Sequence, residues 1–247
     1  MNDSENFLAE FVSGLVNYRD FQNAVLSDSI SKKLLKEIPL IIVDDLISGI
    51  RPTVQEQLDV RDSFREWGIK NKILVNQFEK TKLFVFDCVK SKIQMAFDNV
   101  MLGEGVSLAQ AHAMDNHRSN KEQMLEREND KDISWQFYPV KNLEKFTALN
   151  YLDSKGFAYY LPAYLIWCMD NCLEDPFNNI ASELFGTFDP NFSCFKIKLA
   201  ALRPLQKRGL IDFFWLFAIY SDVYREDCIS SLTGIDDIDF LLRKLVK

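Results

Sequence analysis

The chain has 247 residues, a formal net charge of −7 and an isoelectric point near 5.0, and it is long enough to bury a sizeable core in one large domain or two small ones. Its composition, 47% hydrophobic and 26% charged, is that of a globular protein and excludes a disordered chain. The acidic balance argues against non-specific binding to nucleic acid, which needs a basic face, but it permits a basic partner.

The first third of the chain is predicted to form successive helices. Nine glycines and seven prolines are too few for the many tight turns of an all-β sandwich. Apolar residues recur at helical spacing. Ser4 is the expected N-cap of the first helix, Pro39 breaks the second, and Gly103 stops the long fourth helix. The expected helices cover residues 4–26, 27–50, 52–68 and 71–102.

The sequence between residues 103 and 150 is less regular. The stretch "GEGVSLAQAHAMD" predicts a turn followed by a short helix with Ser107 as its N-cap. The polar connector that follows ends on Trp135, Phe137 and Tyr138, whereas a linker between independent units would be rich in glycine, serine and proline. We therefore expect this connector to lie on the core.

Helical patterns resume at Val140, and the most apolar of them is "GFAYYLPAYLIWCMDNC", residues 156–172. Pro162 lacks an N–H and disfavours helical geometry in the residue before it, so we place it in the first turn of a helix that runs to about Leu173. The sides of this helix are mostly apolar, which predicts a helix that is buried all round, with Trp167 in the core. A short helix over residues 236–247 closes the chain.

These patterns predict an all-α fold: a compact multi-helix domain with an irregular central connector and at most a short, minor pair of strands. Residues 1–85 form an N-terminal helical region in this prediction, and residues 86–247 form a second helical domain. We expect the two regions to pack together as one globular unit.

Few side chains point to catalysis or to a cofactor. His112 and His117 do not share a helix face, and although His112 with Asp115 could form a general-base pair, residues of a polar connector are expected to be solvated. Cys168 and Cys172 share a helix face, but no second ligand pair completes a tetrahedral metal site, so we interpret them as core residues. The stretch "LGEGVSL" lacks the strand and the Gly-Lys-Ser/Thr ending of a phosphate loop. We expect no catalytic residue, no metal and no cofactor.

The cysteines, the N-terminal residues and the length of the apolar runs predict where in the cell the protein is located. Five scattered cysteines do not form a disulfide framework, and "MNDSENFLAEF" lacks the basic and apolar regions of a secretory signal. The longest apolar runs have about eleven residues, which is too short to span a bilayer. The sequence therefore predicts a protein of the reducing cytoplasm that does not enter a membrane.

Three stretches between about residues 90 and 225 resemble the conserved motifs of a known protein family. They are "AFDNVMLGEGVSLAQAHAMDN", "DISWQFYPVKNLEKFTALNYLDSKGFAYYLPAYLIW" and "LRPLQKRGLIDFFWLF". Their LGxGxSLxxA loop, GFxxYLPAYL helix start and LxPLQ helix make the chain similar to an uncharacterised family of bacterial domains of unknown function. Some domains of this kind look like members of toxin–immunity gene clusters, which implies a protein that masks a toxin.

These observations are consistent with two functions. The first is a cytosolic protein-binding module, such as a bacterial immunity or antitoxin protein, whose acidic surface attracts a basic toxin domain. The alternative is an enzyme or small-ligand binder with a pocket near residues 156–172, lined by Tyr159, Tyr160, Tyr164 and Trp167. For the first function, the predicted partner-binding residues are Asp44, Asp45, Glu56, Asp59, Glu126, Glu128, Asp130 and Asp132.

Overall fold

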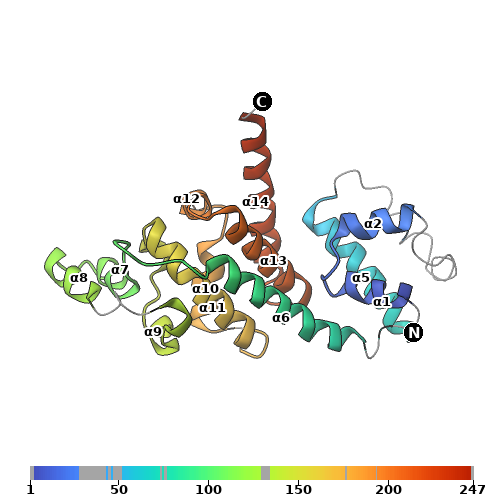
Figure 1. The fold of residues 1–247 in the computed structure, drawn as a ribbon, viewed down its shortest axis with the longest axis horizontal. Helices are drawn as coiled ribbons and strands as arrows, with labels where there is room; N and C mark the ends of the chain where they lie inside the picture. Colours follow the sequence, from blue (N-terminus) through green and yellow to red (C-terminus); the bar gives the residue numbers. More distant parts are fainter. Residues whose placement is uncertain are drawn as a thin grey trace. The chain divides into compact units, whose positions relative to one another are not determined.

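A computed structural model describes residues 3–27, 43, 46, 52–72, 74, 77–128, 134–175, 177–192 and 194–245 (Figure 1). Every regular element in these ranges is a helix, and none of them contains a strand, which confirms the all-α prediction. The chain divides into two compact units, Met1–Cys88 and Val89–Lys247, and the division falls within helix α6 (Gln77–Phe97). Packing of the two predicted regions into one globular unit stays a prediction. None of the described helices is long and apolar enough to cross a membrane.

The predicted helix over residues 4–26 is two helices, α1 (Asp3–Val12) and α2 (Tyr18–Leu26). The first ends because Gly14 takes a left-handed conformation with φ of 86°, which glycine adopts without strain. The second begins at Asn17, whose side chain accepts the backbone N–H of Asp20 at 2.9 Å. Ser4 lies inside α1 and is not its cap. The predicted break at Pro39, in the expected helix over residues 27–50, lies outside the described residues.

The core of the first unit is built on three stacked or edge-on aromatic rings. The ring centroids of Phe11 and Phe21 are 3.9 Å apart, and the Phe64 ring of α5 (Val54–Lys70) meets both edge-on. The buried Arg61 guanidinium lies over the Phe11 ring and donates hydrogen bonds to the carbonyl oxygens of Phe11 and Val16. Arg61 of α5 therefore ties the last turn of α1 and the loop before α2 to α5.

Helix α6 ends at Phe97, five residues before the predicted end at Leu102. The carbonyl oxygen of Phe97 accepts the backbone N–H of Val100 at 3.1 Å and the indole N–H of Trp135 at 3.0 Å, so it closes a turn instead of continuing the helix. Trp135 and Tyr138 are buried, which confirms for these residues that the connector lies on the core. Phe137 between them is exposed.

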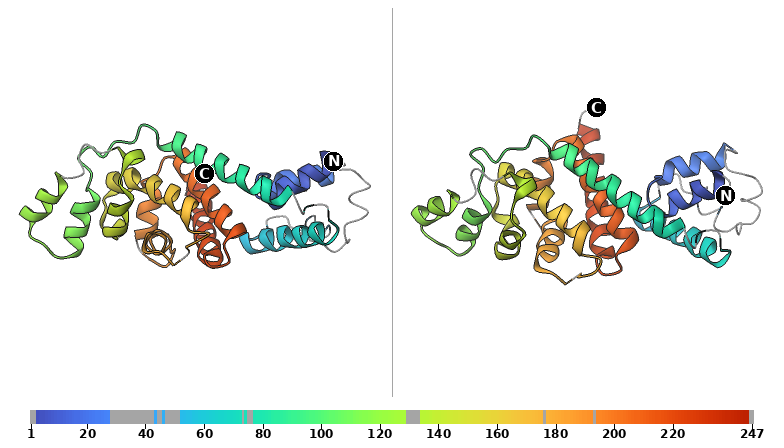
Figure 2. Two further views of the ribbon diagram at one scale, coloured as in Figure 1. Left: turned by 90° about the horizontal axis from the view of Figure 1, so that it is seen from below. Right: turned by 60° about the horizontal axis from the view of Figure 1, so that its bottom comes forward.

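The second unit places α10 and α13 at its centre, with the other helices around them (Figure 2). After α6 its helices are α7 (Leu108–Asp115), α8 (Asn120–Arg127), η1 (Trp135–Phe137), α9 (Val140–Lys145), η2 (Leu149–Tyr151), α10 (Ser154–Asn171), α11 (Asn179–Thr187), α12 (Cys194–Ala200), α13 (Pro204–Tyr220) and α14 (Arg225–Leu245). The rings of Phe213 and Phe217 on α13 pack against Phe185 of α11. The predicted short C-terminal helix is the end of the longer α14.

Helix α10 corrects two expectations about the apolar segment. It begins at Ser154, so Pro162 lies in its interior and not in its first turn, because Asp153 caps the helix by accepting the N–H of Gly156 at 2.8 Å. Tyr160 and Tyr164 are fully buried, whereas Trp167 is only half-buried and Asp170 is exposed. The helix is thus not buried all round: the side that carries Trp167 reaches solvent.

The loop before α7 meets the start of α10 backbone to backbone. Asp153 accepts the N–H of Val106 at 3.0 Å with the same carboxylate oxygen that caps α10. A Cβ atom at Gly156 would lie 2.1 Å from the carbonyl oxygen of Val106, and one at Gly105 would lie 2.8 Å from the nitrogen of Gly156. Gly105 of the LGxGxSL motif and Gly156 of the GFxxYLPAYL motif therefore permit this close contact, so both motifs have a structural role.

Candidate functional site: the α7–α8 hairpin

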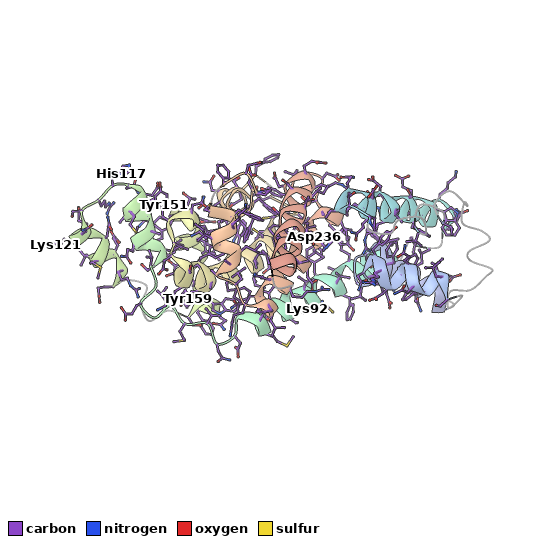
Figure 3. The ribbon with its side chains drawn as sticks, turned by 90° about the horizontal axis from the view of Figure 1, so that it is seen from above. Lys92, His117, Lys121, Tyr151, Tyr159 and Asp236 are labelled. Atoms are coloured by element: carbon purple, nitrogen blue, oxygen red, sulfur yellow. The ribbon has the colours of Figure 1, made fainter. Side chains whose placement is uncertain are left out.

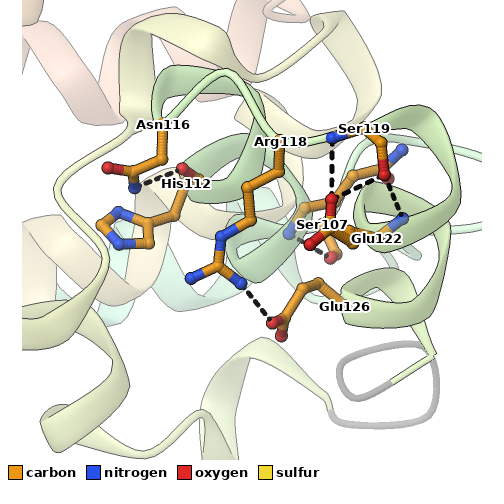
Figure 4. Close-up of polar contacts among 8 residues, drawn as sticks. Ser107, His112, Asn116, Arg118, Ser119, Glu122 and Glu126 are labelled. Atoms are coloured by element: carbon orange, nitrogen blue, oxygen red, sulfur yellow. Dashed lines mark hydrogen bonds and ion pairs between the residues drawn. The ribbon is translucent and has the colours of Figure 1, made fainter.

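Helices α7 and α8 form a hairpin at the margin of the second unit, beyond α9 in the views of Figures 1 and 2. We refer to residues 107–128 as the hairpin. Ser107 caps α7 by accepting the N–H of Gln110 at 3.1 Å, as the sequence predicted. Ser119 and Glu122 cap α8 reciprocally, since each side chain accepts the backbone N–H of the other residue (Figure 4).

The two helices of the hairpin differ in what they bury. Helix α7 buries Leu108 and three alanines, so it is anchored on the core. Helix α8 has eight residues and buries none of them. Its two large apolar side chains, Met124 and Leu125, are 57% and 70% exposed. Helices of this length are marginal in water without tertiary packing, so α8 depends on its caps and on α7.

Polar contacts tie α8 to the turn before it, to α7 and to the loop before α7. Arg118, in the turn between the two helices, pairs with Glu126 at 3.1 Å (Figure 4). Arg127 donates a hydrogen bond to the carbonyl oxygen of Gly103, and the amide of Gln110 lies 3.9 Å from the sulfur of Met124. Because these contacts hold the backbone, the exposed apolar side chains of α8 have a defined position.

The predicted acidic partner-binding residues are dispersed. Four of them lie outside the described residues: Asp44, Asp45, Asp130 and Asp132. Glu56 belongs to the N-terminal cap of α5, where hydrogen bonds from Thr53 lower the pKa of its carboxyl, and Asp59 accepts the side-chain amide of Gln55 at 2.6 Å. Glu126 is paired with Arg118, and Glu128 directly follows α8. Of the four predicted residues that the structure describes, Glu126 and Glu128 lie in the hairpin and Glu56 and Asp59 do not.

His112 is not the solvated residue that the sequence predicted. Its ring packs against Phe146 with centroids 5.3 Å apart, and its Nδ1 atom is buried without a hydrogen-bond partner. Asp115, proposed as its partner, instead accepts a hydrogen bond from the side chain of Tyr151 on η2. The structure gives no contact that would make His112 and Asp115 a general-base pair.

The sequence did not point to two acidic features of the second unit: the half-buried Glu183, and a cluster of three acids at the start of α14. Glu183 on α11 is half-buried and accepts the N–H of Leu149 at 2.7 Å, and burial raises the pKa of its carboxyl. At the start of α14, burial and then the negative charges of Asp189 and Glu226 raise the pKa of Asp227. Asp189 lies 38 residues before Asp227 in the chain, so no local pattern could have shown that they are neighbours.

The tyrosines of α10 fill the core instead of lining an open wall. The rings of Tyr159 and Tyr138 meet the Tyr160 ring edge-on, with centroids 4.8 and 5.0 Å away, and the hydroxyl of Tyr164 donates to the carbonyl oxygen of Phe146 at 3.1 Å. Cys168 and Cys172 are buried, as predicted. Among the residues that the structure describes, no group of three His, Cys, Asp or Glu side chains could hold a metal ion.

Comparison with known proteins gives a family but no function. Neither a curated protein nor a solved structure matched the chain. The sequence model of a family of unknown function, DUF6714, matches residues 87–231, which is more than half of the chain. This match confirms the predicted resemblance to an uncharacterised domain family over about the same residues. The protein therefore belongs to the family of unknown function DUF6714.

Proposed function

We propose that this protein is a protein-binding module that docks a partner through α8. The observation that carries the proposal is that α8 is capped at its start and held by ion-pair and hydrogen-bond contacts, yet buries none of its own side chains. Two adjacent apolar side chains, Met124 and Leu125, face solvent on this helix. Packing them against another protein would supply the apolar burial that α8 lacks in the monomer.

The charge of the chain suggests a basic partner. A net charge of −7 accelerates encounter with a basic protein and disfavours acidic ones. The like charges of Asp189, Glu226 and Asp227 add a negative surface on the second unit. A basic toxin domain fits this description, and we propose an immunity or antitoxin role in the cytoplasm. The alternative, an enzyme or ligand binder with a pocket near residues 156–172, gains no support from tyrosines that are packed in the core.

Site-specific photo-crosslinking in the native cell tests the docking surface. A photo-reactive amino acid at position 125 should give one dominant crosslinked protein, because Leu125 is the more exposed residue of the apolar pair. The matched control is position 197 on α12, where Ile197 is 64% exposed. Equal crosslinking at both positions, or none at position 125, would contradict the proposal.

A charge substitution then measures the energetic importance of the pair. The variant Met124→Glu/Leu125→Glu should weaken binding of the identified partner by at least about tenfold, since truncated interface hot spots cost more than 1 kcal/mol each. Ile197→Glu should leave the affinity unchanged. If the partner is a toxin, the double variant should also fail to protect cells that express it, whereas Ile197→Glu should protect them. Full protection by the double variant would refute docking through α8.

A further inference from the structure

The hairpin contains a side-chain amide whose hydrogen-bonding groups are poorly satisfied. Gln110, in the first turn of α7, is half-buried, and its Oε1 atom is buried without a hydrogen-bond partner among the described residues. Its Nε2 atom has the sulfur of Met124, 3.9 Å away on α8, as its acceptor. A thioether is a weak acceptor, so neither end of this amide has a strong partner. Turning the amide over would exchange its two ends and leave the same deficit.

This amide lies at the end of the hairpin that is remote from its turn. Figure 3 shows His117 at the turn between the two helices, whereas Gln110 belongs to the start of α7 and Met124 to the second half of α8. Arg127 follows Met124 by three residues, a spacing that shares a helix face. Its Nη2 atom donates to the carbonyl oxygen of Gly103, but its Nη1 atom is buried without a partner in the described part of the chain. Both a donor and an acceptor are therefore left over at this end.

Met124 lies against the amide but is not fixed there by the core. Its side chain is 57% exposed and unbranched, with three rotatable bonds, and α8 buries none of its residues. Rotation of the thioether toward solvent gives up the weak contact with Gln110 and leaves the backbone of α8 in place. A partner that packs on Met124 therefore draws this side chain away and uncovers the amide.

We propose that the Gln110 side chain is a hydrogen-bonding site for the main chain of the partner, and that it pairs with the backbone N–H and C=O of one residue in an extended segment. This inference rests on the proposed function and names the kind of segment that docks at α8. A primary amide presents one acceptor and one donor side by side. In an extended chain the N–H and C=O of one residue point to the same side, as in the hydrogen-bonded pairs of an antiparallel sheet.

Other segments of a partner match this site less well. A helix uses its backbone groups internally, so it offers no free N–H and C=O pair to Gln110. A lysine or arginine side chain carries donors alone and would leave Nε2 of Gln110 without an acceptor. An extended segment satisfies both ends of the amide, as main-chain pairing does in other complexes with extended peptides.

The site predicts opposite effects on stability and on binding. Leucine has about the size of glutamine but no polar atoms, so Gln110→Leu removes a buried, poorly paired amide from the free protein and should stabilise it. The same substitution removes two hydrogen bonds from the complex and leaves the partner's backbone groups unpaired, so binding should weaken. A side chain with only a structural role would not separate the two quantities in this way.

Urea denaturation and partner binding are therefore measured on the same full-length variants. We expect Gln110→Leu to lower the unfolding equilibrium constant about tenfold, and to weaken binding of the protein that is crosslinked at position 125 by at least about tenfold. The matched control is Gln123→Leu on α8, which should lower stability, because its amide donates to the carbonyl oxygen of Arg118 at 2.7 Å. Unchanged or lower stability of Gln110→Leu, or unchanged affinity, would overturn the site.

A synthetic peptide of the partner's crosslinked segment locates the backbone contact. N-methylation of one peptide nitrogen should weaken binding to the wild type about tenfold and have no further effect on Gln110→Leu, because both changes remove the same hydrogen bond. Equal losses in the two proteins at every methylated position would contradict pairing with Gln110. If the leucine variant does not fold, Gln110→Ala gives the same comparison without an added side chain.

The amide site and the docking surface can fail separately. If Met124→Glu/Leu125→Glu abolishes binding while Gln110→Leu binds as tightly as the wild type, the amide site is refuted and docking through α8 stands. If position 125 gives no crosslinked protein, docking through α8 is refuted, and the proposed main-chain partner of Gln110 is refuted with it.

Discussion

Replacing Gly156 by alanine is the sharpest test of the contact between the two family motifs. A Cβ at this position would lie 2.1 Å from the carbonyl oxygen of Val106 and 3.1 Å from the carboxylate oxygen of Asp153. Val106 contributes backbone, which cannot rotate away as a flexible side chain could. Either the loop or the start of α10 must therefore move, and the movement strains the hydrogen bonds that Asp153 accepts.

The expected loss of stability combines two effects. Forcing an extra methyl group into a packed site costs about 1–3 kcal/mol. Weakening the N-cap of α10 costs about 1 kcal/mol more. We expect Gly156→Ala to lower the free energy of unfolding of the second unit by about 2–4 kcal/mol. The matched control is Gly186→Ala on α11, where a Cβ would meet nothing within 4 Å and the helix gains about 0.5–1 kcal/mol.

Urea denaturation followed by far-UV circular dichroism and tryptophan fluorescence measures both variants. Three of the four tryptophans, Trp135, Trp167 and Trp215, lie in the second unit and one, Trp67, lies in the first, so most of the emission reports unfolding of the second unit. The two glycine substitutions should shift the midpoint in opposite directions. A Gly156→Ala protein within about 0.5 kcal/mol of the wild type, a change typical of an unconstrained surface site, would refute the close-contact argument.

Three further predictions follow from burial. In a thiol titration of the native protein, the half-exposed cysteines should react with Ellman's reagent, and the buried ones should react only after unfolding. Burial also raises the pKa of the Cys168 and Cys228 thiols, which disfavours the reactive thiolate. Modification of all five cysteines in the native protein would contradict the fold. The half-exposed thiols are Cys88 and Cys194, and the buried ones are Cys168, Cys172 and Cys228. Burial lowers the pKa of Lys198, because it disfavours the charged ammonium. The free energy of unfolding of the wild type, relative to that of Lys198→Met, should therefore increase as the pH rises from the lowered pKa toward 10.5. Equal pH profiles of the two proteins in chemical denaturation would show that burial does not destabilise the charged form of Lys198. Trp167→Ala should cost less than Tyr160→Ala in the same assay, because Trp167 is half-buried and Tyr160 is fully buried.

Local patterns were sufficient for the fold class and for several helix starts. Apolar spacing and the scarcity of glycine and proline predicted an all-α protein, because helix formation depends on residues three and four positions apart. Ser107 was correctly predicted as the cap of α7, because a cap bonds to a backbone group only three residues away. The apolar character of Cys168 and Cys172 likewise identified them as core residues.

Helix ends and functional surfaces depended on contacts that the sequence does not display. Helix α6 ends at Phe97, whose carbonyl oxygen accepts the N–H of Val100 in a turn and the indole N–H of Trp135, and a partner 38 residues away leaves no local signal. For α10, the cap at Asp153 precedes Pro162 by more than two turns, so the proline falls inside the helix.

The sequence by itself determined an acidic, helical protein and the family to which it belongs. The tertiary structure decided which charged groups meet and which apolar groups remain exposed. It placed Glu183 near Asp115, left Met124 and Leu125 on a helix without buried residues, and used the glycine motifs for a backbone contact. The physical reason is that burial and electrostatic interaction depend on distance in space, whereas composition and periodicity record only distance along the chain.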